Sequence, residues 1–467
     1  MNDVYYSDDH VRLHLGNCLD ILPDLPNASV DAVVCDPPYE LGFMGKAWDA
    51  SGIAYNTDVW RQCWRVLKPG GHLLAFGGTR TYHRMTVAIE DAGFQIRDSL
   101  HWIYGSGFPK GQDIAKSIDK RRDDRELVLQ VTSWLAAARD AAGWTNRQID
   151  ALWGFNGMAG HWTSQNKAAG VPTPEQWDRL RVQLGFDDTE IRPLVAELNA
   201  RRGTLGDAWS RREVIGQGFR VRRESDVQLA GLSDGAYELT APASEAARKW
   251  QGWHTALKPA HEPIVLARKP TGYNTTVANV LEHGTGALNI DGCRTQADQD
   301  YRNKCASVVG IDSNRNGDAY GEWTGARTDS AHDAGRWPTN VLLGHSPDCT
   351  GQCTTGCPVA DMHDEARFFP AFRYEAKAPA SERPRLADGT AHPTVKPLAL
   401  MRWLVRLVTP PGGTVLDPFA GSGTTLEACR LEDFQAVGIE VDAAHAKLCR
   451  IRLNTPYMTG LFDGGAA

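Results

Sequence analysis

The segment VLDPFAGSGTT, residues 415–425, constrains the fold more than any other part of the chain. Its apolar start is typical of a buried strand, and Gly421 and Gly423 indicate a tight turn before a helix. A second apolar run, AVGIE, follows that helix and ends at Glu440. A strand, a helix and a second strand form the unit from which sheets covered by helices on both faces are built. The segment therefore predicts an α/β fold.

The same turn has the chemistry of a binding site for a nucleoside cofactor. Glycines let a ligand approach the backbone closely, and N–H groups at the start of a helix point towards it. A carboxylate at the tip of the second strand, here Glu440, can accept hydrogen bonds from two ribose hydroxyls. The patterns G-x-G-x-x-G and G-x-x-x-x-G-K-[ST] are absent, which favours a cofactor without a pyrophosphate. A tight helix cap without a ligand is the alternative interpretation.

Composition and charge exclude several other classes of protein. The chain has 467 residues, of which 42% are hydrophobic, and this suits a globular protein with a sizeable core. Its net charge of −7 excludes a generally basic nucleic-acid coat, although a local basic face is enough to bind DNA. We find no apolar run long enough to span a membrane and no signal peptide, so we expect a cytoplasmic protein. Ten cysteines in a chain of this length do not indicate a small secreted disulfide framework.

Another strand-like segment, SVDAVVC at residues 29–35, is followed by Asp36, Pro37, Pro38 and Tyr39. Prolines fix the backbone and lack an N–H, so this strand end presents a carboxylate and free carbonyl oxygens in a stiff arrangement. Such a set can accept both hydrogens of a planar amino group, and Tyr39 adds a ring on which a flat base can stack. A proline-stiffened loop with a surface aspartate is the alternative. The nucleoside site elsewhere in the chain favours the catalytic interpretation.

Both motifs resemble those of S-adenosylmethionine-dependent amino-methyltransferases that act on DNA. Their order, with DPPY before DPFAGSGTT, resembles the beta group of adenine-N6 and cytosine-N4 enzymes. The segment HPTVKPLALMRWLVRLV, residues 392–408, matches as well, and KPAHEPIVLARKP and GTGALNIDGCR look like phage and bacterial modification methylases. Asn17 stands where an aspartate is common in the family. The resemblance covers about residues 5–110, 255–295 and 390–455.

The resemblance implies a Rossmann-like, seven-stranded methyltransferase sheet with a permuted motif order and a large helical and loop insertion. It implies that Asp36 and the Pro37 carbonyl grip the target amine, while Tyr39 stacks on a base flipped out of the duplex. A sulfonium methyl is the electrophile, so in-line positioning carries much of the rate. The cofactor-binding residues that it implies are Asp417, Phe419, Gly421, Gly423, Glu440, Thr394 and Lys396. Lys396 could equally be an exposed cation beside a helix.

These motifs divide the chain into five segments. Residues 1–110 are expected to form the catalytic half of the core, and residues 391–467 the half that binds S-adenosylmethionine. Residues 255–295 are expected to return to the core as a strand and a loop. Residues 111–254 are polar, helix-prone and rich in arginine and tryptophan, which predicts an inserted part for DNA target recognition. Residues 296–390 are rich in Gly, Asn, Asp and Thr and are expected to be loop-rich.

Two features of the insertion predict contact with DNA. The segments TNRQIDALWG and TPEQWDRLRVQLG have helix-capping signals and are reminiscent of a helix-turn-helix reader, although helix packing alone explains them as well. Seven arginines and two acids between positions 201 and 223 give a local charge of +5, which predicts phosphate contacts; a solvated charged segment is the alternative. The predicted DNA-binding residues are Arg201, Arg202, Arg211, Arg212, Arg220, Arg222 and Arg223, together with Lys46 in a loop near the flipped base. A solvated loop is the alternative for the segment that contains Lys46.

The segment HSPDCTGQCTTGCPV places His345, Cys349, Cys353 and Cys357 within thirteen positions. Four soft ligands suit a tetrahedral zinc ion that would staple a loop-rich region. The spacing is C-x3-C-x3-C, however, and not the paired C-x2-C of common zinc sites. Free thiols are therefore the alternative, and any metal held here is expected to be structural.

The sequence as a whole predicts a DNA methyltransferase that acts on adenine N6 and uses S-adenosylmethionine. Aspartate before Pro-Pro-Tyr favours adenine, and cytosine-N4 methylation is the nearest alternative. Methylation of RNA or of a protein amide is less favoured, and so is a non-catalytic DNA-binding protein, because Asp36, Tyr39, Gly421 and Glu440 are intact. The expected partner is double-stranded DNA and not a membrane, and a homodimer is compatible with the sequence.

Overall fold

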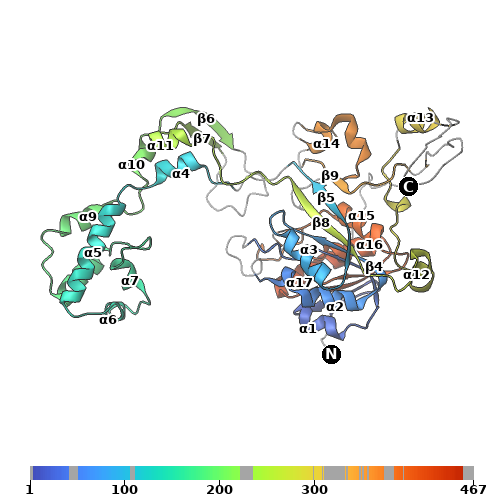
Figure 1. The fold of residues 1–467 in the computed structure, drawn as a ribbon, viewed down its shortest axis with the longest axis horizontal. Helices are drawn as coiled ribbons and strands as arrows, with labels where there is room; N and C mark the ends of the chain where they lie inside the picture. The colour runs from blue at the N-terminus through green and yellow to red at the C-terminus, as the bar shows by residue number, and fades with distance from the viewer. Residues whose placement is uncertain are drawn as a thin grey trace. The chain divides into compact units, whose positions relative to one another are not determined.

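The computed structural model of the chain (Figure 1) describes residues 4–41, 51–105, 111–220, 235–297, 299–307, 335–346, 357–372, 383–392 and 394–455, together with positions 309, 332, 349 and 352–354. The chain forms two compact units. Residues 1–108 and 259–467 form the first, here called the core unit, and residues 109–258 form the second, here called the inserted unit. None of the described helices is long and apolar enough to cross a membrane.

The core unit is built on a mostly parallel sheet that has ten strands in the described residues. The strands are β1 (Val4–Ser7), β2 (Val11–Leu15), β3 (Val30–Cys35), β4 (Leu67–Phe76), β5 (Gln95–Ile103), β8 (His261–Arg268), β9 (Val341–Gly344), β10 (Ala371–Phe372), β11 (Thr414–Asp417) and β12 (Gln435–Glu440). Their order across the sheet is β1-β2-β12-β11-β3-β4-β8-β5-β9-β10. The pairs β1–β2, β4–β8 and β5–β8 are antiparallel. This arrangement confirms the Rossmann-like α/β fold.

The sheet is wider than the seven strands expected. β9 and β10 extend one edge, and they come from the segment 296–390, which we expected to be loop-rich. β1 extends the other edge as the hairpin partner of β2. These three strands have four, two and four residues, and such short strands in polar segments show no readable period. β9 forms because it pairs with β5, and the sequence does not reveal this partner.

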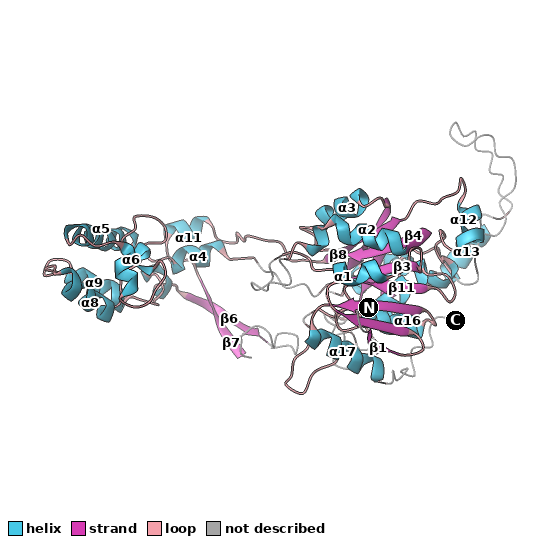
Figure 2. Cartoon of the chain, turned by 90° about the horizontal axis from the view of Figure 1, so that it is seen from below, coloured by secondary structure: helices cyan, strands magenta, loops and turns pink. Residues whose placement is uncertain are grey.

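Helices cover both faces of this sheet (Figure 2). Along β3, Ala32 and Val34 are buried in one hydrophobic core, and Val33 and Cys35 in another. The first core includes α15 (Leu398–Val408), α16 (Thr424–Leu431) and α17 (Ala443–Asn454), and the second includes α1 (Cys18–Ile21), α2 (Thr57–Val66) and α3 (Tyr82–Asp91). The other helical segments of this unit are η1 (Leu22–Asp24), η4 (Ile53–Tyr55), α12 (Thr276–His283), η6 (Asp291–Cys293), α13 (Gln299–Ser307), α14 (Pro358–Asp361) and η7 (His363–Phe368). Because β3 is buried on both faces, the residues directly before Asp36 form a continuous apolar run.

The inserted unit is mainly helical. Its elements are α4 (Ile114–Lys120), α5 (Arg125–Ala141), α6 (Asn146–Ala151), α7 (Met158–Trp162), α8 (Pro174–Leu184), α9 (Arg192–Ala200), α10 (Asp207–Ser210), α11 (Glu245–Lys249) and the hairpin of β6 (Val214–Arg220) and β7 (Gly235–Thr240). α6 and α8 begin with capping boxes formed by Thr145 and Thr173, as their sequences indicate. α5 to α9 share a core around Trp177, whose indole N–H donates to Asp188 at 2.9 Å.

Candidate active site

The two principal motifs meet at one edge of the sheet, although they come from opposite ends of the chain. β3 and β11 are parallel neighbours. Asp36 directly follows β3, and Asp417 is the last residue of β11. Because open α/β sheets bind ligands at the carboxyl ends of their parallel strands, this edge is the expected place for a site.

The carboxylate of Asp36 is held by a buried lysine. Lys396 Nζ lies 2.6 Å from Asp36 Oδ2 and 3.5 Å from Glu262 Oε2. The other oxygen, Asp36 Oδ1, is buried and has no hydrogen-bond partner among the described residues. A buried acceptor without a donor costs folding free energy, so such an atom in a native protein calls for an explanation. We interpret Oδ1 as an acceptor that is unpaired in the protein alone and accepts a hydrogen bond from a bound ligand.

Glu262 connects Tyr39 with the same lysine. The Tyr39 hydroxyl donates to Glu262 Oε2 at 2.8 Å. Burial raises the pKa of Tyr39 well above its ordinary value, and the charges of Asp36 and Glu262 add to this effect. Burial lowers the pKa of Lys396, but the same two carboxylates outweigh burial and leave that pKa raised. Near neutral pH, Tyr39 is therefore neutral and Lys396 is charged.

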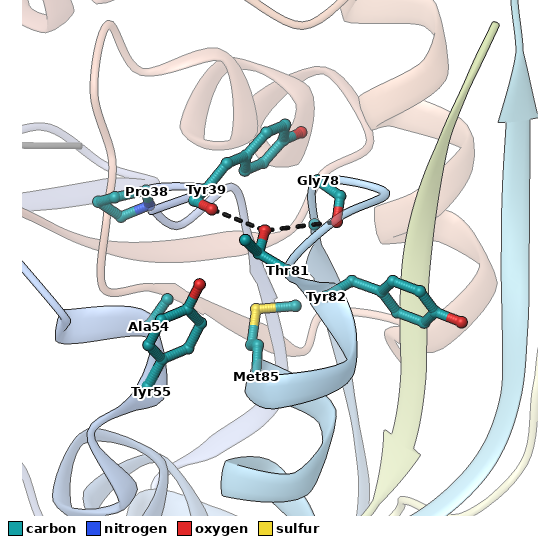
Figure 3. A pocket seen from close by; sticks show the side chains of 9 residues that line it. Pro38, Tyr39, Ala54, Tyr55, Gly78, Thr81, Tyr82 and Met85 are labelled. Atoms are coloured by element: carbon teal, nitrogen blue, oxygen red, sulfur yellow. Dashed lines mark hydrogen bonds between the residues drawn. The ribbon is translucent and has the colours of Figure 1, made fainter. Parts of the chain in front are cut away.

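The backbone of the Asp-Pro-Pro-Tyr turn packs against the loop that follows β4. Thr81 Oγ1 donates to the Tyr39 carbonyl at 2.7 Å, and a Cβ added at Gly78 would lie 3.3 Å from Tyr39 Cβ. Figure 3 shows a pocket beside this contact, and the ring of Tyr39 points away from it. The residues that line the pocket are Pro38, Tyr39, Ala54, Tyr55, Gly77, Gly78, Thr81, Tyr82 and Met85. The tight backbone contact and the bond to Glu262 together fix the direction of the Tyr39 ring.

The glycine turn after β11 is tied to the acid at the end of β12. Gly421 N donates to Glu440 Oε2 at 2.7 Å, and Asp442 N donates to Glu440 Oε1 at 2.8 Å. Gly421 and Gly423 have φ angles of +53° and +82°, and a Cβ at Gly423 would lie 2.4 Å from Cys449 Sγ. Both positions therefore require glycine. Glu440 Oε1 also lies 3.7 Å from His445 Nδ1, and Oε2 keeps a further lone pair with which to accept a ligand hydroxyl.

Asp417 lies beneath this turn and is 2% exposed. Its Oδ1 accepts a hydrogen bond from Phe419 N at 3.0 Å. Burial raises the pKa of Asp417 to about 7, and the charges of Asp36 and Glu440 act in the same direction. The carboxyl is therefore close to half-protonated at neutral pH.

His392 covers the glycine turn from the other side. A Cβ at Gly421 would lie 3.1 Å from His392 Nε2, and the His392 ring lies 4.4 Å from the ring of His445. Burial lowers the pKa of His392 to about 4, with a further contribution from His445, so this ring is neutral. His392 Nδ1 lies 2.7 Å from the carbonyl oxygen of Thr394, which places Thr394 beside the predicted cofactor site. Lys396, which we also expected at the cofactor, instead contacts Asp36.

The sequence analysis did not identify Glu262 or Thr81 as residues of this site. Glu262 is the second residue of β8, which runs antiparallel to β4. The start of an antiparallel strand lies beside the carboxyl ends of its parallel neighbours, so Glu262 reaches the same edge as Asp36. The segment HEPIVLAR could have indicated Glu262 as a residue of the site, but only if the direction of its strand in the sheet had been known.

The structure corrects one member of the predicted DNA-binding set. Arg212 forms an ion pair with Asp119, and the two side chains are 3% and 0% exposed. A guanidinium that is buried and paired in this way is not available to a phosphate. Arg202 and Arg211 are exposed, and Arg201 is half-buried. Lys46, Arg222, Arg223 and the side chain of Arg220 lie outside the described residues.

The four residues of the predicted metal site are brought together. The ligand atoms of His345, Cys349, Cys353 and Cys357 all lie within 4.8 Å of one another. Cys349 and Cys357 are buried, and Cys353 is exposed. The arrangement belongs to the core unit, between β9 and α14.

Comparison with known proteins identifies the family. A family model described as DNA methylase, N6_N4_Mtase, matches residues 30–132 and 235–450, which is more than half of the chain. The chain belongs to this family of DNA methylases. The matched part of the methylase includes both the Asp-Pro-Pro-Tyr turn and the glycine turn, and it omits residues 133–234, which lie in the inserted unit.

Individual relatives of this methylase match over short stretches. The type II methyltransferase M.SmaI of Serratia marcescens is 44% identical over 63 residues, which are 14% of this chain and 22% of M.SmaI. M.HpaI of Haemophilus parainfluenzae is 28% identical over 119 residues, which are 24% of this chain and 37% of M.HpaI. The chain thus spans well under two thirds of either relative.

Solved structures align over most of the chain but with low identity. M1.HpyAVI in complex with SAM is 13% identical, with a TM-score of 0.34 over 95% of this chain and 100% of the other. The PvuII DNA methyltransferase, described as cytosine-N4-specific, is 12% identical, with a TM-score of 0.40 over 98% of this chain and 91% of the other.

Proposed function

We propose that the protein transfers a methyl group from S-adenosylmethionine to the exocyclic amine of a base in duplex DNA, at N6 of adenine. The observation that carries this proposal is the buried oxygen Asp36 Oδ1, which has no partner among the described residues. It lies at the same sheet edge as the glycine turn and Glu440. Membership of the DNA methylase family supports amino-methylation, and aspartate before Pro-Pro-Tyr favours adenine over the cytosine-N4 alternative.

The proposed role of Asp36 follows from the chemistry of the amine. An exocyclic amine is a weak nucleophile because its lone pair is delocalised into the ring. Asp36 Oδ1 and the Pro37 carbonyl would accept its two N–H groups and favour a pyramidal nitrogen with a localised lone pair. The nitrogen gains positive charge as the new N–C bond forms and the S–C bond breaks, and the carboxylate stabilises that charge. The sulfonium leaves as the neutral thioether of S-adenosylhomocysteine, and the nitrogen then loses one proton to solvent, which gives a neutral methylated amine.

Lys396 and Glu262 are proposed to position these groups. Lys396 holds Oδ2 of Asp36 and so directs Oδ1 to the incoming amine. Glu262 accepts from the Tyr39 hydroxyl and so fixes the ring on which a base can stack. The target base must leave the duplex to reach this turn, and a stacking ring offsets part of the cost of flipping it.

The residues at the glycine turn fit S-adenosylmethionine, which supplies an electrophilic methyl group on a sulfonium. Glu440 Oε2 has a free lone pair for a ribose hydroxyl, and Gly421 and Gly423 carry no side chain to obstruct a nucleoside. Asp417 suits a cationic ligand, because a positive charge nearby favours the ionised form of a buried carboxyl. We propose Phe419 and Thr394 as further contacts at this end of the site.

Product analysis tests this function directly. The full chain is incubated with duplex DNA and S-adenosylmethionine, the DNA is digested to nucleosides, and the products are identified by mass spectrometry. We expect N6-methyldeoxyadenosine, and no product when the cofactor is omitted. N4-methyldeoxycytidine would refute the assignment to adenine but keep the reaction class. If DNA that contains many different sequences yields no methylated base, the proposal is overturned.

The inserted unit is proposed to contact the DNA backbone through Arg201, Arg202 and Arg211. Replacing these three by glutamine is expected to weaken DNA binding and to flatten its dependence on salt, by roughly 0.9 in the log–log slope for each phosphate that is no longer neutralised. Fluorescence anisotropy with labelled duplex at several salt concentrations measures the slope. A control in which Arg12, Arg61 and Arg450 of the core unit are replaced has the same net charge, and these three are exposed, as are Arg202 and Arg211. Equal slopes in the two variants would contradict the assignment.

A further inference from the structure

We propose that His345, Cys349, Cys353 and Cys357 bind one structural zinc ion. A tetrahedral zinc ion lies about 2.0 to 2.3 Å from its nitrogen and sulfur ligands, which places the ligand atoms roughly 3.5 to 3.8 Å from one another. His345 Nδ1 lies 3.4 Å from Cys353 Sγ and 3.7 Å from Cys357 Sγ. All four ligand atoms lie within 4.8 Å of one another. The cluster thus already has nearly the size of a zinc coordination sphere.

The surroundings of the sulfur atoms also suit a metal site. Ser346 N donates to Cys357 Sγ at 3.4 Å, and Thr354 N donates to Cys349 Sγ at 3.4 Å. Backbone N–H groups aimed at sulfur stabilise the thiolate form, which is the form that binds a metal, and they orient the ligand. Three sulfurs and one imidazole as ligands favour zinc over harder cations such as magnesium or calcium. Four protein ligands leave no open coordination position, so the site is structural and not catalytic.

The position of the cluster in the fold indicates what the ion would stabilise. His345 directly follows β9, and its backbone N–H donates to the carbonyl oxygen of Phe372 in β10 at 2.8 Å. Cys357 is the residue that precedes α14. A metal at this point would link the end of β9 to α14 and so hold the last two strands of the sheet. These strands have only four and two residues, so their pairing alone contributes little.

Metal analysis of the full-length protein tests the proposal. We expect one zinc per chain by inductively coupled plasma mass spectrometry after purification without added metal. Replacement of zinc by cobalt(II) is expected to give thiolate charge-transfer bands and the visible d–d bands of a tetrahedral ion. Removal of the ion by a chelator is expected to lower the melting temperature, and added zinc is expected to restore it. These readouts do not depend on DNA methylation.

Variants separate the cluster from other cysteines of the chain. Cys353→Ser is expected to lose zinc and to melt at a lower temperature, while Cys353→His, which keeps a ligand, is expected to retain zinc. Cys305→Ser is the matched control, because Cys305 is a partly exposed cysteine of α13 outside the cluster, and it is expected to keep full zinc content. A native protein without zinc that also gives no tetrahedral cobalt spectrum would overturn the proposal. So would a mass showing a disulfide among these cysteines in place of the metal.

Discussion

Asp36→Asn is expected to lower the rate of methyl transfer about 10³-fold and to leave the affinity for S-adenosylmethionine unchanged. The amide has one oxygen where the carboxylate has two. Lys396 Nζ lies 2.6 Å from Oδ2, and it can only be satisfied by an acceptor, so the amide would turn its oxygen to the lysine. Its NH2 group would then face the target amine, which is also a donor. Asparagine at this position should therefore be no better than alanine.

Single-turnover kinetics with saturating cofactor measure the rate, and titration calorimetry measures the affinity for the cofactor. Asp31→Asn is the matched control. Asp31 lies on β3, the strand that Asp36 directly follows. It is buried and forms an ion pair of the same length with Lys68, 2.6 Å between Asp31 Oδ1 and Lys68 Nζ. This variant should lose stability but keep the rate of its folded fraction. A similar loss of rate in both variants would mean that Asp36 acts only through the fold.

The chemistry of each motif could be predicted because it is local. The glycines of the cofactor turn are required by backbone angles and by close packing against nearby elements, and Asp-Pro-Pro-Tyr is a contiguous run. The α/β fold followed for the same reason, since strands such as β3 and β4 end in short apolar runs, AVVC and LLAF. These features can be recognised in the sequence without knowledge of the tertiary structure.

Long-range pairings could not be predicted in the same way. The ion pair of Asp36 with Lys396 joins residues 360 positions apart, and the sequence equally suited an exposed or a cofactor-bound Lys396. Arg212 looked like its neighbours in a basic segment, yet its partner Asp119 buries it. Whether a charge is solvated or paired is decided by the packing of distant elements, and composition alone does not contain that information.

Lys396→Met is expected to be the second most damaging change, with a loss of about 10² to 10³ in the rate of methyl transfer. Removing one partner of a buried ion pair leaves an uncompensated charge, at a cost of about 3 to 5 kcal/mol. Without the lysine, Asp36 Oδ2 loses its partner and Oδ1 is no longer directed to the target amine. We therefore expect the single-turnover rate of the folded protein to fall, and not only its melting temperature. A role of Lys396 in the fold alone would lower the melting temperature and leave that rate unchanged.

The same variant distinguishes the two roles considered for Lys396. If it positions Asp36, the single-turnover rate at saturating cofactor falls while the dissociation constant of S-adenosylmethionine changes little. If it binds the methionine end of the cofactor, the dissociation constant rises and the saturated rate recovers. Lys269→Met is the control for burial, because Lys269 and Lys396 are both 8% exposed and Lys269 Nζ donates to the carbonyl oxygens of Trp64 and Leu67. That control should lower the melting temperature and leave the single-turnover rate unchanged, because Lys269 Nζ bonds to backbone carbonyl oxygens and not to Asp36.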